Sequence, residues 1–294
     1  MFEQRPIVGH IRFSFYGVTD TRERPDDTGE ALARLYDETR MARRFHLFEN
    51  LTLPSLRAQT DKDFQLVVMS SDVMPERFKT RLSALMAGFP GAVVDYSLYQ
   101  RSDKAFRPHM QASFGPNQTG TAVHFRLDDD DALGRTFIAD LRRISQTLPP
   151  STHITVPRGL ILFPASLDSP EGAVMEELRY LTAIGLSVVG SAAFPKNPFQ
   201  MMHGNVWGRW PTVSWPRCHA FIRTQHFTND TLARQDKILT ALRAERFSRR
   251  AGRYIASVDA ALTESFPFID QTRLAALLGE NLAVTSLADL QPVA

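Results

Sequence analysis

Runs of apolar residues alternate with segments of helical periodicity through the first half of the chain. Four strands are predicted from β-branched and aromatic runs, at 7–18, 64–71, 91–99 and 120–127. Helical spacing predicts helices over 31–57, 75–89 and 136–148, with Pro54 expected to kink the first or restart it as a first-turn proline. This alternation is typical of strand–helix–strand units. We therefore expect an α/β fold with a mixed, mainly parallel sheet flanked by helices on both faces.

The pattern becomes irregular after about residue 150. Segment 153–164 predicts a tight antiparallel hairpin around a Pro-Arg-Gly turn, and 186–195 predicts a strand. Segment 196–216 is rich in Pro, Gly, Trp and Met, which is typical of a long ordered loop. Two further helices are predicted, at 231–250 and 270–280. The second half should therefore be an irregular and helical part of the molecule.

Composition narrows the class of protein. The 294 residues, 43% of them hydrophobic, can build one large domain or two modest ones. A net charge of +2 offers no large basic field, so nucleic acid is not an expected partner. The single cysteine, Cys218, excludes an internal disulfide and a zinc–thiolate cage. We find no secretory signal and no apolar run long enough for a transmembrane segment, and expect a cytoplasmic protein or one held peripherally at the inner membrane.

Acidic residues follow two of the predicted strands. Asp72 ends the strand 64–71, and Asp128 to Asp131 end the strand 120–127 in the stretch "HFRLDDDDAL". Ligands of parallel α/β sheets bind outside the carboxyl ends of the strands. Because both acidic positions fall at such ends, we expect them to lie at one edge of the sheet and to form a binding site.

The four consecutive aspartates have two interpretations. They could be a charged loop that caps the helix beginning near Thr136, although two or three acids would suffice for a cap and a fourth adds repulsion. Alternatively, they bind Mg²⁺ or Mn²⁺, which prefer carboxylate oxygens and share their ligands with phosphates. In an extended chain, alternation would send Asp128 and Asp130 to one side and Asp129 and Asp131 to the other.

These motifs resemble those of a known family. The stretch "LDDDDAL" after an apolar strand is similar to the DxD motif of glycosyltransferases with the nucleotide-diphospho-sugar transferase (GT-A) fold. Together with "LFENLTLPSLRAQTDKDFQLVVMSSD" upstream, it resembles a bacterial family named for rhamnosyl transfer, over roughly residues 40 to 145. The resemblance implies a GT-A fold and a metal-dependent, inverting glycosyltransferase. Its donor would be a nucleotide-diphosphate sugar, for which the family name suggests rhamnose, and its acceptor a glycan or a lipid-linked molecule.

The resemblance also implies roles for individual residues. Asp72 would accept a hydrogen bond from a pyrimidine base, and Asp128 would meet the ribose or a metal-bound water. Asp130, with Asp128, would bind the Mn²⁺ or Mg²⁺ that bridges the two phosphates. Many relatives carry a Gly-x-x-x-Ala-Arg-Asn helix before the DxD strand, which is absent here. Arg126 or Lys104 could supply the missing arginine contact.

The acceptor and the catalytic base are expected in the second half. We predict a nucleotide-sugar-binding half over 1–150 and an acceptor-binding half with C-terminal helices over 151–294, within one continuous domain. Asp236 is the candidate base, with a solvated helix position as the alternative. Trp207 and His203 are candidates for acceptor binding, and ordinary packing or a hydrogen-bonded loop histidine is the alternative for them.

Two other functions remain open on the sequence alone. The chain could be a non-catalytic nucleotide- or carbohydrate-binding module that has kept the same fold. It could also be a metal-dependent phosphotransferase or nucleotidyltransferase that uses the aspartates. The absence of a Gly-rich loop with a lysine weighs against a phosphotransferase of the P-loop type.

Overall fold

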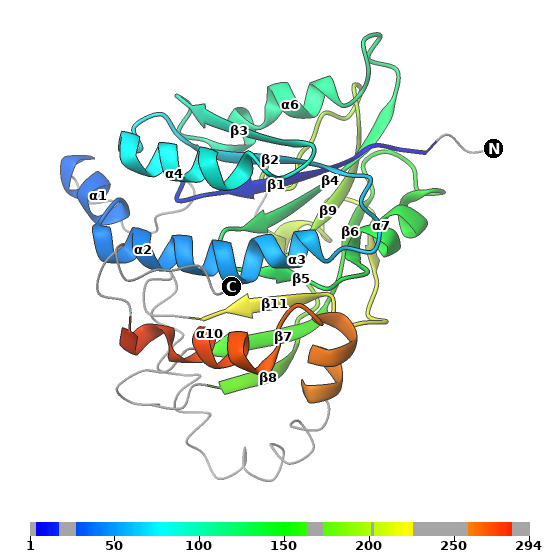
Figure 1. Cartoon of the computed structure of the whole chain (residues 1–294). Helices are drawn as coiled ribbons and strands as arrows, with labels where there is room; N and C mark the ends of the chain where they lie inside the picture. The colour runs from blue at the N-terminus through cyan, green and yellow to red at the C-terminus, as the bar shows by residue number, and fades with distance from the viewer. Residues whose placement is uncertain (1–3, 18–27, 164–172, 201–202, 226–257, 284–294) are drawn as a thin grey trace.

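A seven-stranded sheet forms the centre of the molecule in the computed structural model, which describes residues 4–17, 28–163, 173–200, 203–225 and 258–283 (Figure 1). Its strand order is β10-β6-β9-β4-β1-β2-β3. The strands β1 to β4 are parallel to one another, and β9 is antiparallel to its neighbours β4 and β6. The predicted mixed, mainly parallel sheet is therefore confirmed. The strands are β1 (Ile7–Arg12), β2 (Gln65–Ser71), β3 (Ala92–Ser97), β4 (Thr121–Asp128), β6 (His153–Thr155), β9 (Ser187–Ser191) and β10 (Thr212–Ser214).

Helices cover both faces of this sheet. One face packs through Ile7 and Ile11 of β1 and Val68 of β2 against the first group of helices. These are α1 (Thr28–Leu35), α2 (Glu38–Leu47), the π-helical η1 (Phe48–Thr52), α3 (Leu53–Arg57), α4 (Glu76–Met86) and α7 (Phe137–Ser145). Val8 and Val67 point to the opposite face, which is covered by α5 (Ser102–Ala105), α6 (Arg107–Ala112) and the segment around Phe199. Successive side chains along these strands point alternately into the two apolar layers, as strand geometry requires.

The helix predicted over 31–57 is divided rather than continuous. Asp37 caps α2 by accepting a hydrogen bond from the Arg40 backbone N–H. Pro54 lies in the first turn of α3, where its missing N–H costs nothing, as predicted. The wide π-turn η1 joins α2 to α3, so the helical run continues across the proline instead of breaking.

A second, four-stranded sheet was not predicted. Its order is β5-β11-β7-β8, from β5 (Ala132–Leu133), β11 (Phe221–Thr224), β7 (Arg158–Phe163) and β8 (Ala173–Leu178). The hairpin predicted over 153–164 is wrong, because β6 pairs with β9 and β10 whereas β7 pairs with β8 and β11. Val156 and Pro157 carry the chain from one sheet to the other. The helical segment 258–265 and α10 (Gln271–Ala283) pack on the second sheet, which lies on the other side of α2 and α3 from the large sheet (Figure 1).

Other predictions in the second half have mixed outcomes. The strand predicted at 186–195 is β9, and the helix predicted at 270–280 is α10. The segment 196–216 is mostly irregular where it is described, and it contains the short helix η2 (His203–Asn205) and the strand β10. The helix predicted at 231–250 lies outside the described residues. Within the described part of the chain, no helix is long and apolar enough to cross a membrane.

Candidate functional site

The carboxyl ends of the parallel strands meet at one edge of the large sheet. The register places Arg12 of β1 opposite both Met69 of β2 and Asp128 of β4. Asp72 follows the end of β2, and its backbone N–H donates to the carbonyl of Ser97 at the end of β3 (3.0 Å). Asp72 and Asp128 therefore lie at the same edge with β1 between their strands. Asp72 is three residues beyond the position level with Asp128, so the two backbones are roughly 14 Å apart. This is the placement that the strand pattern predicted.

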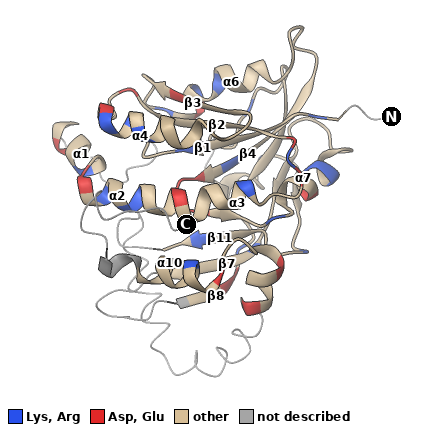
Figure 2. Cartoon of the chain, viewed as in Figure 1, with Lys and Arg blue, Asp and Glu red and all other residues tan. Residues whose placement is uncertain are grey.

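The four aspartates form a tight turn between the two sheets. β4 ends at Asp128, residues 129–130 are a turn, and β5 begins at Ala132. The predicted alternation of side chains is therefore wrong, because the chain is not extended at this point. Instead, the guanidinium of Arg44 lies 2.8 Å from a carboxylate oxygen of Asp129 and 2.5 Å from one of Asp130. In Figure 2 this acidic turn lies beside basic positions of α2 and β4.

The upstream motif holds this turn in place. The hydroxyl of Thr52, at the end of the π-turn, lies 3.1 Å from the carbonyl oxygen of Asp129 and 2.8 Å from that of Asp131. Gln59 donates from its side-chain amide to the carbonyl of Gly134 and accepts from the backbone N–H of Ile138, both at 3.0 Å. The two sequence motifs are thus two sides of one buried hydrogen-bonded junction.

Two other segments complete the enclosure of the turn. The Thr224 backbone N–H donates to the Asp131 carboxylate (3.0 Å), and its hydroxyl donates to the carbonyl of Asp130 (2.7 Å). On the opposite side, the Ser14 backbone N–H donates to the Asp129 carboxylate (2.9 Å). Ser14 has a φ of 42°, in the left-handed region that a serine seldom adopts. Such strain is often found at functional sites, and here the hydrogen bond to Asp129 holds it.

Arginines explain how four carboxylates are tolerated together. Burial raises the pKa of Asp128, but the charges and hydrogen bonds of Arg12 and Arg126 outweigh it and hold this pKa well below its usual range. Burial and the neighbouring carboxylates raise the pKa of Asp131 well above its usual range. The pKa of Asp129 is also raised by burial, with Arg44 opposing the shift. Asp128 is therefore charged at neutral pH. Its side chain is 26% exposed, whereas that of Asp130 is 8% exposed.

The chemistry of the turn suits a hard divalent cation. Within the residues that the structure describes, no three His, Cys, Asp or Glu side chains are grouped to hold a metal by themselves. A cation here would take one or two carboxylates and complete its coordination with water and substrate phosphate. Mg²⁺ commonly binds in this way, and it prefers these oxygen ligands. Mg²⁺ or Mn²⁺ at this turn therefore stays a prediction.

The other predicted site residues are dispersed. Trp207 is 65% exposed, and His203 is half-buried in η2. Asp236 lies outside the described residues. Lys104 is exposed on α5, whereas Arg126 reaches the carboxylate of Asp128 (3.1 Å).

Sequence reasoning missed Arg12 and Arg44. The signal for Arg12 was partial: it is a charged residue within a predicted apolar strand at 7–18, and only the structure shows that the strand ends there.

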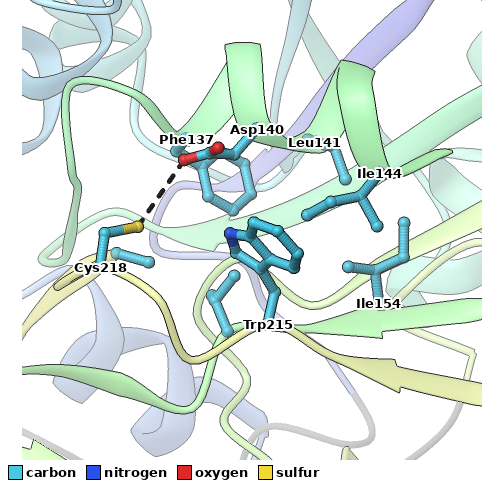
Figure 3. Close-up of a pocket in the computed structure, with 9 residues that line it drawn as sticks. Phe137, Asp140, Leu141, Ile144, Ile154, Trp215 and Cys218 are labelled. Carbon is cyan, nitrogen blue, oxygen red and sulfur yellow. Dashed lines mark hydrogen bonds between the residues drawn. The ribbon is translucent and has the colours of Figure 1, made fainter. Parts of the chain in front are cut away.

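The small pocket beneath α7 is separate from the acidic turn (Figure 3). Its lining contains none of the four aspartates and is mostly apolar. The Cys218 thiol lies 3.7 Å from the Asp140 carboxylate, and burial together with that charge raises the thiol pKa to about 11. Cys218 is therefore protonated at neutral pH and acts as a small packed side chain.

The fold and the site define a class of protein. A mostly parallel sheet β3-β2-β1-β4, with an antiparallel strand beside β4 and helices on both faces, agrees with the GT-A fold that the sequence resemblance implied. A family model described as "Putative rhamnosyl transferase" matches residues 6–238, and the chain belongs to this family of glycosyltransferases. A comparison with curated proteins found no match.

Several solved structures are similar to this chain at low identity. S. aureus TarS in complex with UDP-GlcNAc is 9% identical, with a TM-score of 0.43 over 95% of this chain and 72% of that one. A longer TarS structure is 10% identical, with a TM-score of 0.39 over 82% of this chain, which spans only 40% of that protein. A Bacillus anthracis structure titled as a putative glucose-1-phosphate thymidylyltransferase, in complex with a sucrose, is 8% identical, with a TM-score of 0.37 over 73% of this chain and 88% of that one.

Proposed function

We propose that this glycosyltransferase moves a sugar from a nucleotide-diphosphate donor to a hydroxyl of a glycan or lipid-linked acceptor, with inversion at the anomeric carbon. The observation that carries the proposal is the placement of Asp72, Asp128 and the buried acidic turn at one strand edge, in a member of the rhamnosyl transferase family. Rhamnose is the donor sugar that the family name favours. A pyrimidine nucleotide is the expected carrier.

The nucleotide would bind across the ends of β1, β2 and β4. Asp72 is exposed just beyond β2, where its carboxylate can accept the ring N–H of a pyrimidine. Asp128 lies two strands away, where it can meet the ribose or a metal-bound water.

Asp130, with Asp128, would hold Mn²⁺ or Mg²⁺. When bound, such a cation stabilises the charge that develops on the departing diphosphate. The protein fixes the position of the Asp130 carboxylate through Arg44, and that of its backbone carbonyl through the Thr224 hydroxyl. Because the turn is buried between two sheets, its carboxylates are oriented before the donor arrives.

The catalytic base is proposed in the acceptor-binding half. Two acids of β8 are occupied with structural contacts. Glu177 accepts two hydrogen bonds from the Arg223 guanidinium (2.8 and 2.6 Å), and Glu176 accepts from Arg158 (2.6 Å) and pairs with His219 (3.0 Å). Burial raises the pKa of Glu176, but the hydrogen bonds of Arg158 and His219 outweigh it and lower this pKa, so Glu176 is a poor proton acceptor. The proposed base is Asp236, as the sequence predicted.

Donor turnover tests this function. The protein should be incubated with Mn²⁺ and either dTDP-rhamnose or UDP-sugars, with simple glycans and lipid-linked saccharides as acceptors. We expect release of the nucleoside diphosphate, faster with the right acceptor, and a product of inverted anomeric configuration by NMR. Tight binding of a donor with no release under any of these conditions would contradict the proposal and favour a binding module.

A further inference from the structure

Two arginines meet at a single carboxylate where β1 and β4 end. Arg12 donates to an Asp128 carboxylate oxygen from both Nε (3.2 Å) and Nη2 (2.9 Å). Arg126, two residues before Asp128 on the same strand, reaches the other oxygen at 3.1 Å. All three side chains therefore project from the same face of adjacent parallel strands.

An aromatic ring lies against both guanidiniums. The guanidinium carbons lie 4.7 Å (Arg12) and 4.4 Å (Arg126) from the centre of the Phe199 ring. Phe199 stacks in turn on the buried ring of Phe106, with centroids 5.1 Å apart and planes 9° from parallel. The Asp128 carboxylate and the Phe199 ring therefore both restrain the guanidinium planes of the two arginines.

The segment that carries Phe199 is itself anchored. The Asn197 side chain donates to the carbonyl of Asp103 at the start of α5 (2.9 Å) and accepts from the Phe199 backbone N–H (3.0 Å). Asn197 is buried. The position of the ring is therefore fixed by contacts that do not involve the arginines, so the ring can set their orientation.

Neither arginine side chain is fully covered at the edge where the donor is proposed to bind (Arg12 16% exposed, Arg126 10%). Planar guanidiniums held in a fixed orientation suit the paired oxygens of a phosphate group. The chain also lacks a Gly-rich phosphate loop, so the diphosphate needs another source of donors.

We propose that Arg12 and Arg126 bind the diphosphate of the donor, and that Asp128 and Phe199 are positioning residues that hold the two guanidiniums. This inference rests on the proposed function and assigns its phosphate subsite. It implies that part of the diphosphate charge is neutralised by the protein, without the cation. Binding of a nucleoside diphosphate should therefore persist, more weakly, when metal is removed.

The test compares UDP, UMP and uridine by calorimetry, in Mn²⁺ and in EDTA. Arg12→Lys and Arg126→Lys keep the charge opposite Asp128 but lose the planar fork. We expect each to weaken UDP binding about ten- to hundredfold in both conditions, with a smaller loss for UMP and little change for uridine. Arg143→Lys is the matched control, because Arg143 is 57% exposed on α7 and pairs with Asp140. Its UDP affinity should equal that of the wild type.

Substitutions of Phe199 test whether its aromatic ring positions the two arginines or only fills space. Phe199→Leu removes the aromatic face and should lower the preference for UDP over UMP, whereas Phe199→Tyr should retain it. A second measurement uses the wild type alone: inorganic pyrophosphate should compete with UDP in EDTA, so the inference can be tested even if a variant does not fold.

Three results would overturn the inference. These are UDP affinities within twofold of the wild type for both arginine variants, equal losses for UDP and uridine, or no competition by pyrophosphate. If the wild type binds neither UDP nor dTDP in Mn²⁺, the proposed function fails and this inference fails with it. If the wild type binds but the arginine variants bind equally well, only the inference fails.

Discussion

The hydroxyl of Thr52 lies 2.8 Å from the carbonyl oxygen of Asp131, a residue 79 positions later in the chain. This contact joins the two motifs through which the sequence resembles a glycosyltransferase family. Both residues are buried, so the hydroxyl satisfies carbonyl groups that water does not reach. The two motifs therefore occur together because one is the physical support of the other.

Removing that hydroxyl should loosen the acidic turn. Thr52→Val keeps the side-chain shape but leaves buried carbonyls without their donor, so we expect a loss of about 1–3 kcal/mol of unfolding free energy and slower transfer. Urea denaturation measures the first and donor turnover the second. Thr263→Val is the control, because that exposed hydroxyl also bonds a backbone carbonyl but lies on a surface helix. Equal losses for the two variants would show that the junction has no special role.

Asp130→Ala should abolish transfer and preserve the fold. Arg44 keeps its partner Asp129 in this variant, and repulsion within the turn decreases, so the melting temperature should stay the same or rise. Asp63→Ala, at a carboxylate that is 80% exposed, is the control and should remain active. Wild-type turnover in Mn²⁺ by an Asp130→Ala protein of unchanged melting temperature would refute the metal assignment.

Gly134 follows the acidic turn at a point of close backbone contact. A Cβ at this position would lie 2.6 Å from the carbonyl oxygen of His219, and that backbone cannot give way easily. Gly134→Ala should therefore destabilise the protein by about 1–3 kcal/mol through overpacking. Gly204→Ala meets nothing within 4 Å and should be nearly neutral. Chemical denaturation of both variants compares them, and a neutral Gly134→Ala would mean that β5 and β11 do not pack as described.

Buried histidines should make stability depend on pH. Burial lowers the pKa of His10, and it lowers those of His124 to about 3 and of His46 and His153 to about 4. In the unfolded chain these histidines have pKa values near 6.5. At mildly acidic pH the unfolded chain therefore binds more protons than the folded protein does. Stability is complete above about pH 7 and falls as the pH drops below 6.5, by up to about 1.4 kcal/mol per pH unit for each histidine.

The variant that tests this dependence is His124→Gln. His10 and His124 face each other at 3.0 Å, and the substitution should make the fall between pH 6.5 and 5 less steep. Urea denaturation at half-unit pH steps supplies the slopes. An identical slope in His124→Gln and the wild type would contradict the assignment.

The first half of the fold was predictable because its information is local. Apolar runs such as 64–71 are buried strands whichever partners they take, and the acids that follow them mark the carboxyl edge. The second sheet was not predictable in this way. Its pairs join distant segments, such as β5 with β11, and nothing local at Val156–Pro157 shows that the chain passes between sheets there.

The site was predicted in part for a similar reason. The aspartates are visible as a motif, but the arginines that balance them are not. Arg44 lies in α2, where an arginine ordinarily faces solvent, and only the tertiary fold places it 7% exposed against Asp129 and Asp130. The turn at 129–130 also overrode the expected alternation, since the chain is not extended where it passes from β4 to β5 of the second sheet.

The most direct test of the account is nucleotide binding at the strand edge. Dissociation constants for UDP and dTDP in Mn²⁺ should be measured by calorimetry for the wild type, Asp72→Ala and Trp207→Ala. The account predicts that Asp72→Ala weakens binding by about ten- to hundredfold, the cost of about 1–3 kcal/mol for one lost hydrogen bond to the base. Trp207→Ala, at an exposed residue proposed to meet the acceptor, should bind as the wild type does. Loss of nucleotide affinity in Trp207→Ala, with none in Asp72→Ala, would contradict the account.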